Sequence, residues 1–471
     1  MKNFFAADIG HYRGRTYIGH VADDGVTLEL LSQFPVQPIT VLGHVYWGFY
    51  TVYQNILLAL RKVAERGVNI ESIGICAVGC DLCCFGVDGQ LLAQPFSSID
   101  PMSEEALHKF FSHMTRSELF RTNGMQRLRY LSIYQLEAMR RQGSTVLNSA
   151  GHILFIADAL NYLLTGQMVS EASLVSASGL VNVTGGHLDS WLLKLMGLSS
   201  KLFGCIAPMG SVVGHLSAEV QQLTGLNDVP VVAVAGQDLA SALVSAPVAS
   251  RTDRFCYLWD DYVASVGLEV PQPVVSDKTE AANVSNILSV DGRTNITRIQ
   301  RGGLLLNRCL DELGVAGLPV SRLADMARNA SPFSAIFNPD IKEFHHATSI
   351  LRAIDSYMER TQQSVPTGKP AVLKCVLDSF CNHYAEALAS ISDAVGGCNG
   401  NLYVLGSFAD NDYVCQQLAN FSQRRVVAGP VAAAATGNVM VQALASGVAN
   451  NIWELRELQS RSPLTRSYDP V

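Results

Sequence analysis

Residues 229–247 read Val-Pro-Val-Val-Ala-Val-Ala-Gly-Gln-Asp-Leu-Ala-Ser-Ala-Leu-Val-Ser-Ala-Pro, and this stretch decides how the rest of the chain is interpreted. Residues 231–235 are continuously apolar, which predicts a strand buried on both faces. Gly236 and Gln237 interrupt the run, and small apolar residues after Asp238 predict the first turns of a helix. Asp238 therefore follows the carboxyl end of a buried strand, where ligands collect in open α/β sheets. A simpler interpretation, that Asp238 is only a helix N-cap, stays open.

Length and composition limit the class of protein. A chain of 471 residues is too long for one core, so two or three domains are expected, and 48% apolar against 16% charged residues indicates a well-buried globular protein. The net charge is −7 and no run of Lys or Arg is long enough for a nucleic-acid patch. No apolar stretch reaches the roughly 18 residues that a membrane span requires. We therefore expect neither nucleic acid nor membrane as a partner.

The cysteines and the N-terminus point to a cytoplasmic location. The 11 cysteines are scattered, many of them within apolar runs, which favours reduced thiols over a disulfide framework. Cys80 and Cys83 form a C-x-x-C pair, but no second pair follows that would complete a metal site, so we interpret them as core residues. Asp8 interrupts the apolar N-terminus too early for a signal peptide.

The N-terminal residues predict a hairpin whose turn is suited to anions. Residues 4–7 and 16–21 predict two strands, and the turn between them carries Gly10, Arg13, Gly14 and Arg15. Glycines allow backbone N–H groups to approach a phosphate, and arginines add charged donors. Asp8 at the strand end is a candidate for holding hydrated Mg²⁺. An ordinary polar hairpin is the alternative interpretation.

Further along the chain, the pattern of the first half recurs. Residues 254–258 and 263–270 predict a second hairpin, so the chain looks like two copies of one plan. The apolar run 73–84 predicts one buried strand, within which the carboxylate of Asp81 needs a partner or a ligand. The other predicted elements are helices over 44–65, 110–142, 154–164, 192–198, 218–223, 371–391 and 432–445, a strand over 402–405, and a segment over 295–307 that crosses a double glycine into a helix.

Several stretches together resemble one family. They are residues 8–10 with 14–15, 78–81, 157–166, 235–238, and 427–430 with 437–438. On these the chain resembles the FGGY family of carbohydrate kinases, and within it the rhamnulokinases. The resemblance implies an α/β fold of two actin-like (ribonuclease-H-like) domains around a deep cleft. It places the sugar side and the catalytic base in residues 1–247 and the nucleotide side in residues 248–471.

The resemblance also implies a reaction and its residues. The reaction is ATP-dependent phosphorylation of a ketose hydroxyl, the 1-hydroxyl of an L-rhamnulose-like sugar, with ATP and Mg²⁺ as cofactors. Asp238 matches the catalytic base, Asp8 matches the acid that holds hydrated Mg²⁺, and Gly79, Asp81 and Gln237 fall on the sugar side. The residues that match the nucleotide and phosphate positions are Asp8, Gly10, Arg13, Gly14, Arg15, Tyr262, Asn307 and Gly406.

The sequence departs from the family at several of these positions. Asp260-Asp261-Tyr262 replaces a Ser-Gly-Thr phosphate loop, and one carboxylate about 4 Å from a phosphate charge costs about 1 kcal/mol in water and about 4 at a dielectric near 20. Phe408 follows Gly406 where backbone approach favours glycine. The other departures are Ile299 for Asn, Asn307 for Gln, Ala433 for Glu, Val78 for Trp, Ile99 for Arg and Gln237 for His.

Three functions therefore remain open at the level of sequence. The first is a working sugar kinase with an unusual nucleotide pocket. The second is a catalytically degenerate paralogue that binds a sugar or regulates a partner. The third, an actin-like or chaperone-type ATPase, is disfavoured by the recognisable sugar-side stretches. The low fraction of charged residues leaves a homodimer open.

Overall fold

The computed structural model describes residues 1–23, 25–248, 250, 253–259, 263–300, 302–330, 335–461 and 465–471, apart from the side chains of residues 304, 345 and 346. Within these ranges the chain forms two compact units. The first unit contains Met1–Pro247, Val270–Ile296 and Ala434–Ser462, and the second contains Val248–Glu269, Thr297–Ala433 and Pro463–Val471. Among the helices so described, none is both long and apolar enough to cross a membrane.

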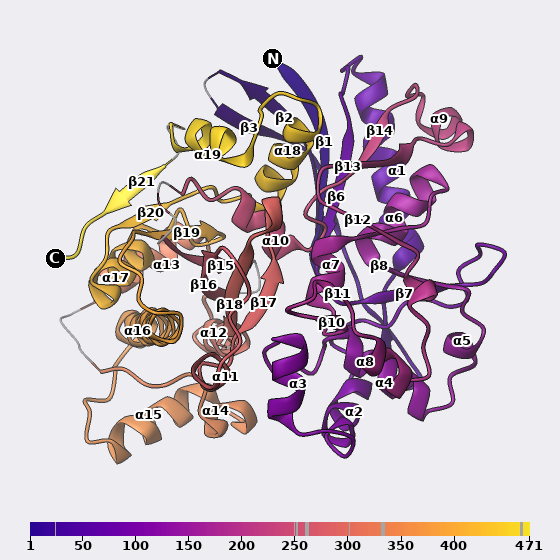
Figure 1. The fold of residues 1–471 in the computed structure, drawn as a ribbon. Coiled ribbons are helices and arrows are strands. Elements are labelled where there is room, and N and C mark those ends of the chain that lie inside the picture. The colour runs from indigo at the N-terminus through magenta and orange to yellow at the C-terminus, as the bar shows by residue number, and fades with distance from the viewer. Residues whose placement is uncertain are drawn as a thin grey trace. The chain divides into compact units, whose positions relative to one another are not determined.

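The first unit is built on a six-stranded mixed sheet in the order β13-β14-β6-β1-β2-β3 (Figure 1). Strands β14, β6 and β1 run parallel, and β1, β2 and β3 are joined as antiparallel neighbours. Apolar side chains such as Phe5, Ile73 and Val231 are fully buried between the sheet and its helices. The bounds are β13 (Ser211–His215), β14 (Pro230–Ala233), β6 (Ile73–Ala77), β1 (Lys2–Ile9), β2 (Arg13–Ala22) and β3 (Gly25–Pro35).

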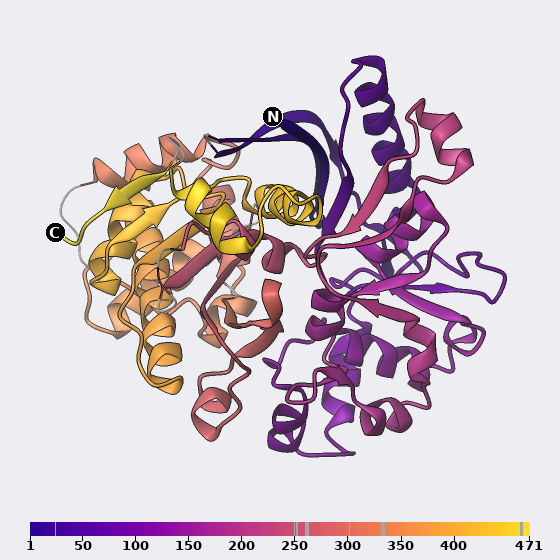
Figure 2. The same cartoon turned by 45° about the horizontal axis from the view of Figure 1, so that its top comes forward.

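Helices cover both faces of this sheet. Figure 2 shows α1 on one face and α18 on the opposite face. Gly166, with φ of 74°, ends α6 in the left-handed conformation that favours glycine, as the sequence predicts. The helices are α1 (Phe49–Glu65), α2 (Met102–Phe110), α3 (Arg116–Asn123), α4 (Ser132–Arg141), α5 (Thr145–Asn148), α6 (Ile156–Thr165), α7 (Ala172–Ala177), α8 (Ser190–Leu195), α9 (Ala218–Thr224), α10 (Asp238–Val244), α11 (Asp277–Ala281), α18 (Ala433–Ala445, apart from its first residue) and α19 (Ile452–Ser460).

The first unit also contains short strands outside its main sheet. Four two-stranded pairs lie outside the main sheet: β4 (Ile39–Val41) with β5 (His44–Tyr46), β7 (Leu82–Phe85) with β8 (His152–Phe155), β9 (Val169–Glu171) with β12 (Cys205–Ala207), and β10 (Val181–Asn182) with β11 (His187–Leu188). The strand β17 (Ser285–Leu288) contacts α7. The β7–β8 pair matters for the site because Asp81 immediately precedes β7.

The second unit repeats the plan of the first. The strands that belong to this unit run in the order β18-β16-β15-β19-β20-β21, with β15, β19 and β20 parallel and β15 antiparallel to β16. Strands β15, β16, β19 and β20 thus correspond in order and direction to β1, β2, β6 and β14, which confirms the predicted duplication. The bounds are β18 (Thr294–Gln300, in this unit from Thr297), β16 (Ala264–Val270), β15 (Arg254–Leu258), β19 (Leu402–Gly406), β20 (Val426–Ala428) and β21 (Arg466–Tyr468).

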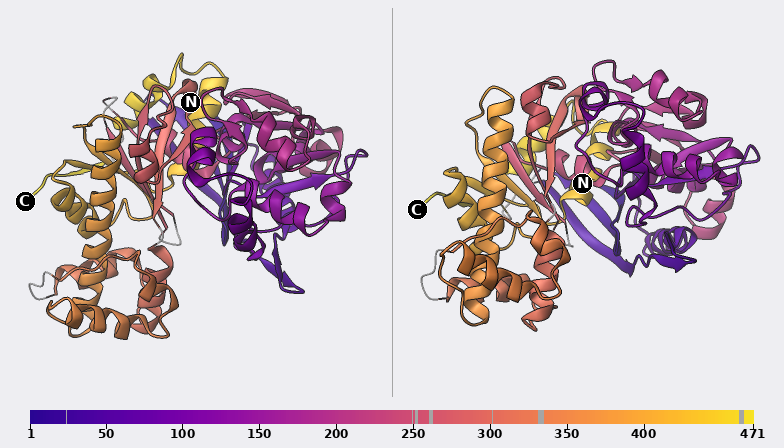
Figure 3. Two further views of the ribbon diagram at one scale, coloured as in Figure 1. Left: turned by 60° about the horizontal axis from the view of Figure 1, so that its bottom comes forward. Right: turned by 90° about the horizontal axis from the view of Figure 1, so that it is seen from below.

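One long helix dominates the second unit. Figure 3 shows α16 extending beyond the sheet toward the helices formed by residues 303–360. Pro370 occupies the first turn of α16, where its missing N–H costs no hydrogen bond. The helices are α12 (Gly303–Glu312), α13 (Val320–Arg328), α14 (Lys342–His346), α15 (Ile350–Arg360), α16 (Lys369–Ala394) and α17 (Asp412–Ser422).

Three predicted elements are wrong in their extent. The run 73–84 is not one strand, because the backbone turns at Cys80, with φ of 90°, and β6 and β7 belong to different sheets. The segment 110–142 is not one helix: it contains the last residue of α2 and two separate helices, α3 and α4, and α3 ends at Gly124 with φ of 64°. The helix predicted over 44–65 begins only at Phe49, because its first residues pair as β5.

Candidate active site

Asp238 is the first residue of α10, directly after the turn that follows β14. The helix N-cap is Gln237, whose side chain accepts a hydrogen bond from the Ala240 N–H at 3.1 Å. The interpretation of Asp238 as only the N-cap is therefore wrong. Its carboxylate is 4% exposed, and its Oδ1 accepts a hydrogen bond from the Leu239 N–H at 2.7 Å. A carboxylate at this position is stabilised by the helix dipole.

Three parallel strands bring the predicted residues to one edge of the first sheet. Backbone hydrogen bonds fix the strand ends: Ala77 N–H donates to the Gly236 carbonyl and Val78 N–H to the Ile9 carbonyl, each at 2.9 Å. Because parallel strands end at the same edge, Asp8 from β1, Gly79 after β6 and Asp238 after β14 lie on one side of the sheet.

The thiol of Cys76 lies beside Asp8 and is influenced by the charge of Asp238. Cys76 Sγ is 3.9 Å from Asp8 Oδ1. Burial raises the pKa of Cys76, and the charges of Asp8 and Asp238 raise it further. Burial likewise raises the pKa of Cys80, with the charges of Asp81 and Asp238 adding to the effect. Asp238 is thus within electrostatic reach of both thiols, between the end of β1 and the turn before β7.

The hairpin turn between β1 and β2 brings two arginines to the strand ends that carry Asp8. Asp8 pairs with Arg15, Ile9 pairs with Gly14, and the Gly10 N–H donates to the Arg13 carbonyl at 2.9 Å. Arg13 is exposed and Arg15 is half-buried, so two guanidinium groups lie at the same strand ends as Asp8. Gly14 is required for packing, because a Cβ there would come within 2.3 Å of the Phe34 ring.

Asp81 is held by three hydrogen bonds inside the first unit. Its Oδ2 accepts from Trp47 Nε1 at 2.7 Å and from the Ser98 N–H at 2.9 Å, and its Oδ1 accepts from Gln135 Nε2 at 3.0 Å. Burial raises the pKa of Asp81, whereas the charge of His11 and these donors lower it. The carboxylate is fully buried, so its direct effect is to fix the loop that follows Gly79.

Glu171 positions the turn that carries Asp238, and the sequence did not single it out. Its carboxylate is 1% exposed and accepts hydrogen bonds from the Gly236 N–H at 3.0 Å, the Leu174 N–H at 3.2 Å, and the Ser173 N–H and hydroxyl. Burial raises the pKa of Glu171 to about 7, against these donors. Asp158, which accepts from the Glu171 N–H at 3.1 Å, has its pKa raised well above its ordinary value by burial and by Glu171. The two buried acids form one coupled pair.

Helix α18 supports the same strand ends from behind. Gln442 Nε2 donates to the Phe5 carbonyl at 3.0 Å, and the Ser241 hydroxyl of α10 donates to the Ala434 carbonyl at 2.8 Å. Gly437 is in direct backbone contact with α10, because a Cβ there would lie 1.7 Å from the Ser241 carbonyl oxygen. The position of Asp238 therefore depends on close packing between α10 and α18.

The residues predicted to contact nucleotide and phosphate are divided between the two units. Asp8 and the turn residues 10–15 belong to the first unit, whereas Asn307 and Gly406 belong to the second. Gly406 ends β19 with φ of 85°, and a Cβ there would lie 2.1 Å from the Leu258 carbonyl oxygen, so only glycine fits. The Ser407 hydroxyl donates to the Trp259 carbonyl at 2.8 Å, and Phe408 is 4% exposed, with its ring packed inside the unit. Asn307 is half-buried on α12. Tyr262, with Asp260 and Asp261, lies outside the described residues.

The donor set suits magnesium bound chiefly through water and phosphate. Within the described ranges, no group of three or more His, Cys, Asp or Glu side chains forms a metal cage. Mg²⁺ in kinase sites is held by one or two carboxylates together with waters and substrate phosphates. Asp8 and Asp238 at one sheet edge fit that requirement, and Asp8 is the more exposed of the two.

Comparison with known proteins gives the family. Residues 38–245 match the N-terminal domain, and residues 267–446 the C-terminal domain, of the FGGY family of carbohydrate kinases. A rhamnulokinase from Bacteroides thetaiotaomicron is 37% identical over 469 residues, covering 100% of this chain and 96% of that protein. The chain belongs to the FGGY family of carbohydrate kinases.

Solved structures agree with the fold. A xylulose kinase and a gluconate kinase from Lactobacillus acidophilus superpose with TM-scores of 0.81 and 0.83, each at 14% identity and over 100% of this chain and 94% of the other. A Plasmodium falciparum glycerol kinase with ADP gives 0.82 at 13% identity, with the same coverage. At these identities the likeness shows the fold, and it confirms the expected α/β architecture of two actin-like domains.

Proposed function

We propose that this protein is an ATP-dependent kinase that phosphorylates the 1-hydroxyl of L-rhamnulose or a close ketose. The observation that carries the proposal is the position of Asp8, Asp238 and the glycine-arginine hairpin turn at the same edge of the first sheet. These are the residue types that phosphoryl transfer requires, namely a proton acceptor, a metal ligand and phosphate donors. The full-length similarity to a rhamnulokinase supports the choice of sugar.

In this proposal Asp238 accepts the proton of the attacking sugar hydroxyl. Asp238 stands at the N-terminus of α10, where the helix dipole favours negative charge, and the hydrogen bond from the Gly236 N–H to Glu171 fixes the turn before it. The guanidinium groups of Arg13 and Arg15, at the turn between β1 and β2, neutralise phosphate charge. A bound Mg²⁺ supplies further neutralisation at Asp8.

The sugar would contact the loop after β6 and the turn before α10. Gly79 and Gln237 touch closely, since a Cβ on Gly79 would lie 2.5 Å from Gln237 Cγ. Asp81 supports this loop from below through Trp47 and Gln135. We assign the sugar side to residues 1–247 and the nucleotide side, with Asn307, Gly406 and Tyr262, to residues 248–471.

A coupled assay of ADP release tests this function. Wild-type protein is assayed with MgATP and a panel of L- and D-ketoses, among them L-rhamnulose, L-fuculose, D-xylulose and D-fructose. The expected result is a kcat/KM for L-rhamnulose that exceeds those of the other sugars by at least about ten-fold, which corresponds to about 1.4 kcal/mol of transition-state discrimination. ADP release that no sugar accelerates would contradict the proposal.

The second candidate function is a catalytically degenerate, sugar-binding paralogue. Asp260-Asp261-Tyr262 in place of a Ser-Gly-Thr phosphate loop favours this candidate, because carboxylates repel nucleotide phosphates. The position of Phe408 argues against this candidate. Its ring is buried inside the unit and does not project into solvent, so it does not obstruct a nucleotide beside Gly406. Calorimetric titration with MgADP separates the two: the degenerate paralogue gives no binding heat at millimolar nucleotide, whereas the kinase gives a saturable isotherm.

A further inference from the structure

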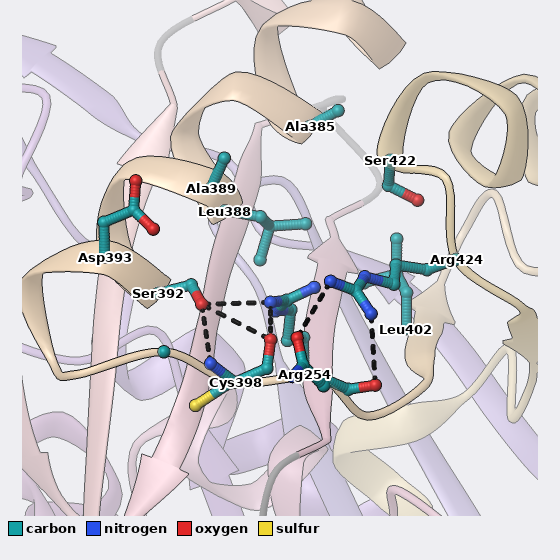
Figure 4. Close-up of a pocket in the computed structure, with 12 residues that line it drawn as sticks. Arg254, Ala385, Leu388, Ala389, Ser392, Asp393, Cys398, Leu402, Ser422 and Arg424 are labelled. Carbon is teal, nitrogen blue, oxygen red and sulfur yellow. Dashed lines mark hydrogen bonds between the residues drawn. The ribbon is translucent and has the colours of Figure 1, made fainter.

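A small basic cavity lies within the second unit, at the amino-terminal end of β15. Its volume is about 210 Å³, which is smaller than the roughly 300–1,000 Å³ of sites for drug-sized ligands. It is enclosed by β15, β19, the C-terminal part of α16, the loop after that helix, and the segment after α17 (Figure 4). Two arginines, Arg254 and Arg424, lie in its wall.

Arg254 is a buried cation that retains hydrogen-bonding capacity. Its side chain is 7% exposed, and its Nη2 donates to the Ser392 hydroxyl at 3.0 Å and to the Cys398 carbonyl. Its Nε is buried and has no acceptor among the residues that the structure describes. Because buried donors of charged groups are normally satisfied, this Nε–H indicates an acceptor other than the residues that the structure describes.

Arg424 brings a second guanidinium to the same cavity. Its Nη1 and Nη2 donate to the backbone and side-chain oxygens of Asn399, both at 3.2 Å. Burial lowers the pKa of Arg254, and the charge of Arg424 lowers it further, so the two cations are within electrostatic reach of each other. Such a pair is unfavourable unless an anion lies nearby.

The protein provides only weak compensation for this charge. Asp393 also lines the cavity, but it is exposed, and it raises the pKa of Arg254 by less than burial and Arg424 each lower it. Figure 4 shows the Asp393 carboxylate apart from both guanidinium groups.

We propose that this cavity binds an oxyanion of phosphate size, either free or as the phosphoryl group of a small metabolite. Guanidinium groups recognise such anions through paired, charge-assisted hydrogen bonds. The site is separate from the proposed nucleotide contacts, because Arg254 and Leu258 are at opposite ends of β15 and Leu258 is the residue that pairs with Gly406. At the usual rise per residue, these two ends are about 13 Å apart.

Calorimetric titration with inorganic phosphate at constant ionic strength tests the proposal. The wild-type chain is expected to bind phosphate, and Arg424→Gln is expected to weaken binding by about ten-fold or more, as befits the loss of a charged donor. The matched control is Arg425→Gln, since Arg425 is the exposed neighbour and does not line the cavity. It should leave the affinity unchanged.

A second variant and a second probe complete the test. Ser422→Asp places a carboxylate in the cavity wall without removing an arginine, and it should also weaken phosphate binding. Glycerol 3-phosphate distinguishes the sources: tighter binding than inorganic phosphate assigns the site to a phosphorylated metabolite, and equal or weaker binding assigns it to the free anion. The proposal would be overturned if neither probe bound to the wild-type chain. It would also be overturned if Arg424→Gln and Ser422→Asp bound phosphate as tightly as Arg425→Gln does.

Discussion

Replacing Gly437 by alanine should disturb the catalytic base from a distance. Gly437 lies on α18, and an added Cβ would be 1.7 Å from the Ser241 carbonyl oxygen and 2.7 Å from its carbonyl carbon. Contacts of Cβ atoms below 3.0 Å are essentially never seen, so α10 and α18 must separate by at least about 1.3 Å, the difference between 3.0 and 1.7. The clash involves backbone, so side-chain rotation cannot relieve it.

The displacement reaches Asp238 because Ser241 is three residues further along the same short helix. Overpacking of this kind costs about 1–3 kcal/mol, and the backbone clash places Gly437→Ala at the upper end of that range. A shift of about 1 Å in a catalytic group can cost about 10²-fold in rate. We therefore expect Gly437→Ala to lower both the free energy of unfolding and kcat with L-rhamnulose.

Urea unfolding followed by circular dichroism gives the first quantity, and coupled ADP release gives the second. Gly48→Ala is the matched control, because Gly48 has φ of −78° and an added Cβ would have its nearest neighbours at 3.6 and 3.8 Å. It should leave both quantities close to those of wild type. If Gly437→Ala matched Gly48→Ala in stability and kcat, the dependence of Asp238 on the contact between α10 and α18 would be refuted.

Three further changes test other parts of the site. Asp238→Asn keeps the Oδ1 acceptor for Leu239 but removes the proton acceptor, so kcat should fall by about 10²–10⁴-fold with an unchanged circular dichroism spectrum; a fall below ten-fold would remove Asp238 from the chemistry. Asp81→Asn replaces one carboxylate oxygen by an amide N–H, which then faces the N–H donor of Trp47, Ser98 or Gln135. The free energy of unfolding in urea should fall by about 1–3 kcal/mol, and an unchanged midpoint would disprove this. Because the folded-state pKa of Glu171 is raised to about 7, its contribution to stability is greatest below its ordinary pKa and declines as the pH rises through 7. The free energy of unfolding of wild type relative to Glu171→Gln should therefore fall by about 3 kcal/mol between pH 4.5 and 8, and a difference that stays constant or grows with pH would contradict the assignment.

Strong local signals made much of the fold predictable. The hairpin at residues 4–21 and the strand 254–258 have the expected type, and Gly166 ends its helix, because alternation, apolar runs and left-handed glycines are properties of short segments. The prediction of a single strand over residues 73–84 was wrong because the residues stay apolar through the turn of the backbone at Cys80. Only the tertiary anchoring of Asp81 by Trp47 reveals why the backbone turns there.

The candidate site was predictable only in part. The position of Asp238 after a buried strand follows from sequence, but the capping role of Gln237 does not, because both residue types occupy helix starts. Glu171 was missed because its link to Gly236 joins residues 65 positions apart. The available sequence signal was an acidic residue directly before the short run Ala172–Ala177, which forms α7. The basic cavity around Arg254 and Arg424 was invisible for the same reason, since its walls are far apart in the chain.

The central claim is that this chain transfers the γ-phosphoryl group of ATP to a ketose. The most direct measurement is phosphorus NMR of wild-type protein incubated with MgATP and L-rhamnulose, with the product's attachment position read from its proton couplings. We predict one phosphomonoester on the 1-oxygen, formed in equal amount with ADP. Complete recovery of ATP and sugar after prolonged incubation at high protein concentration would contradict the account.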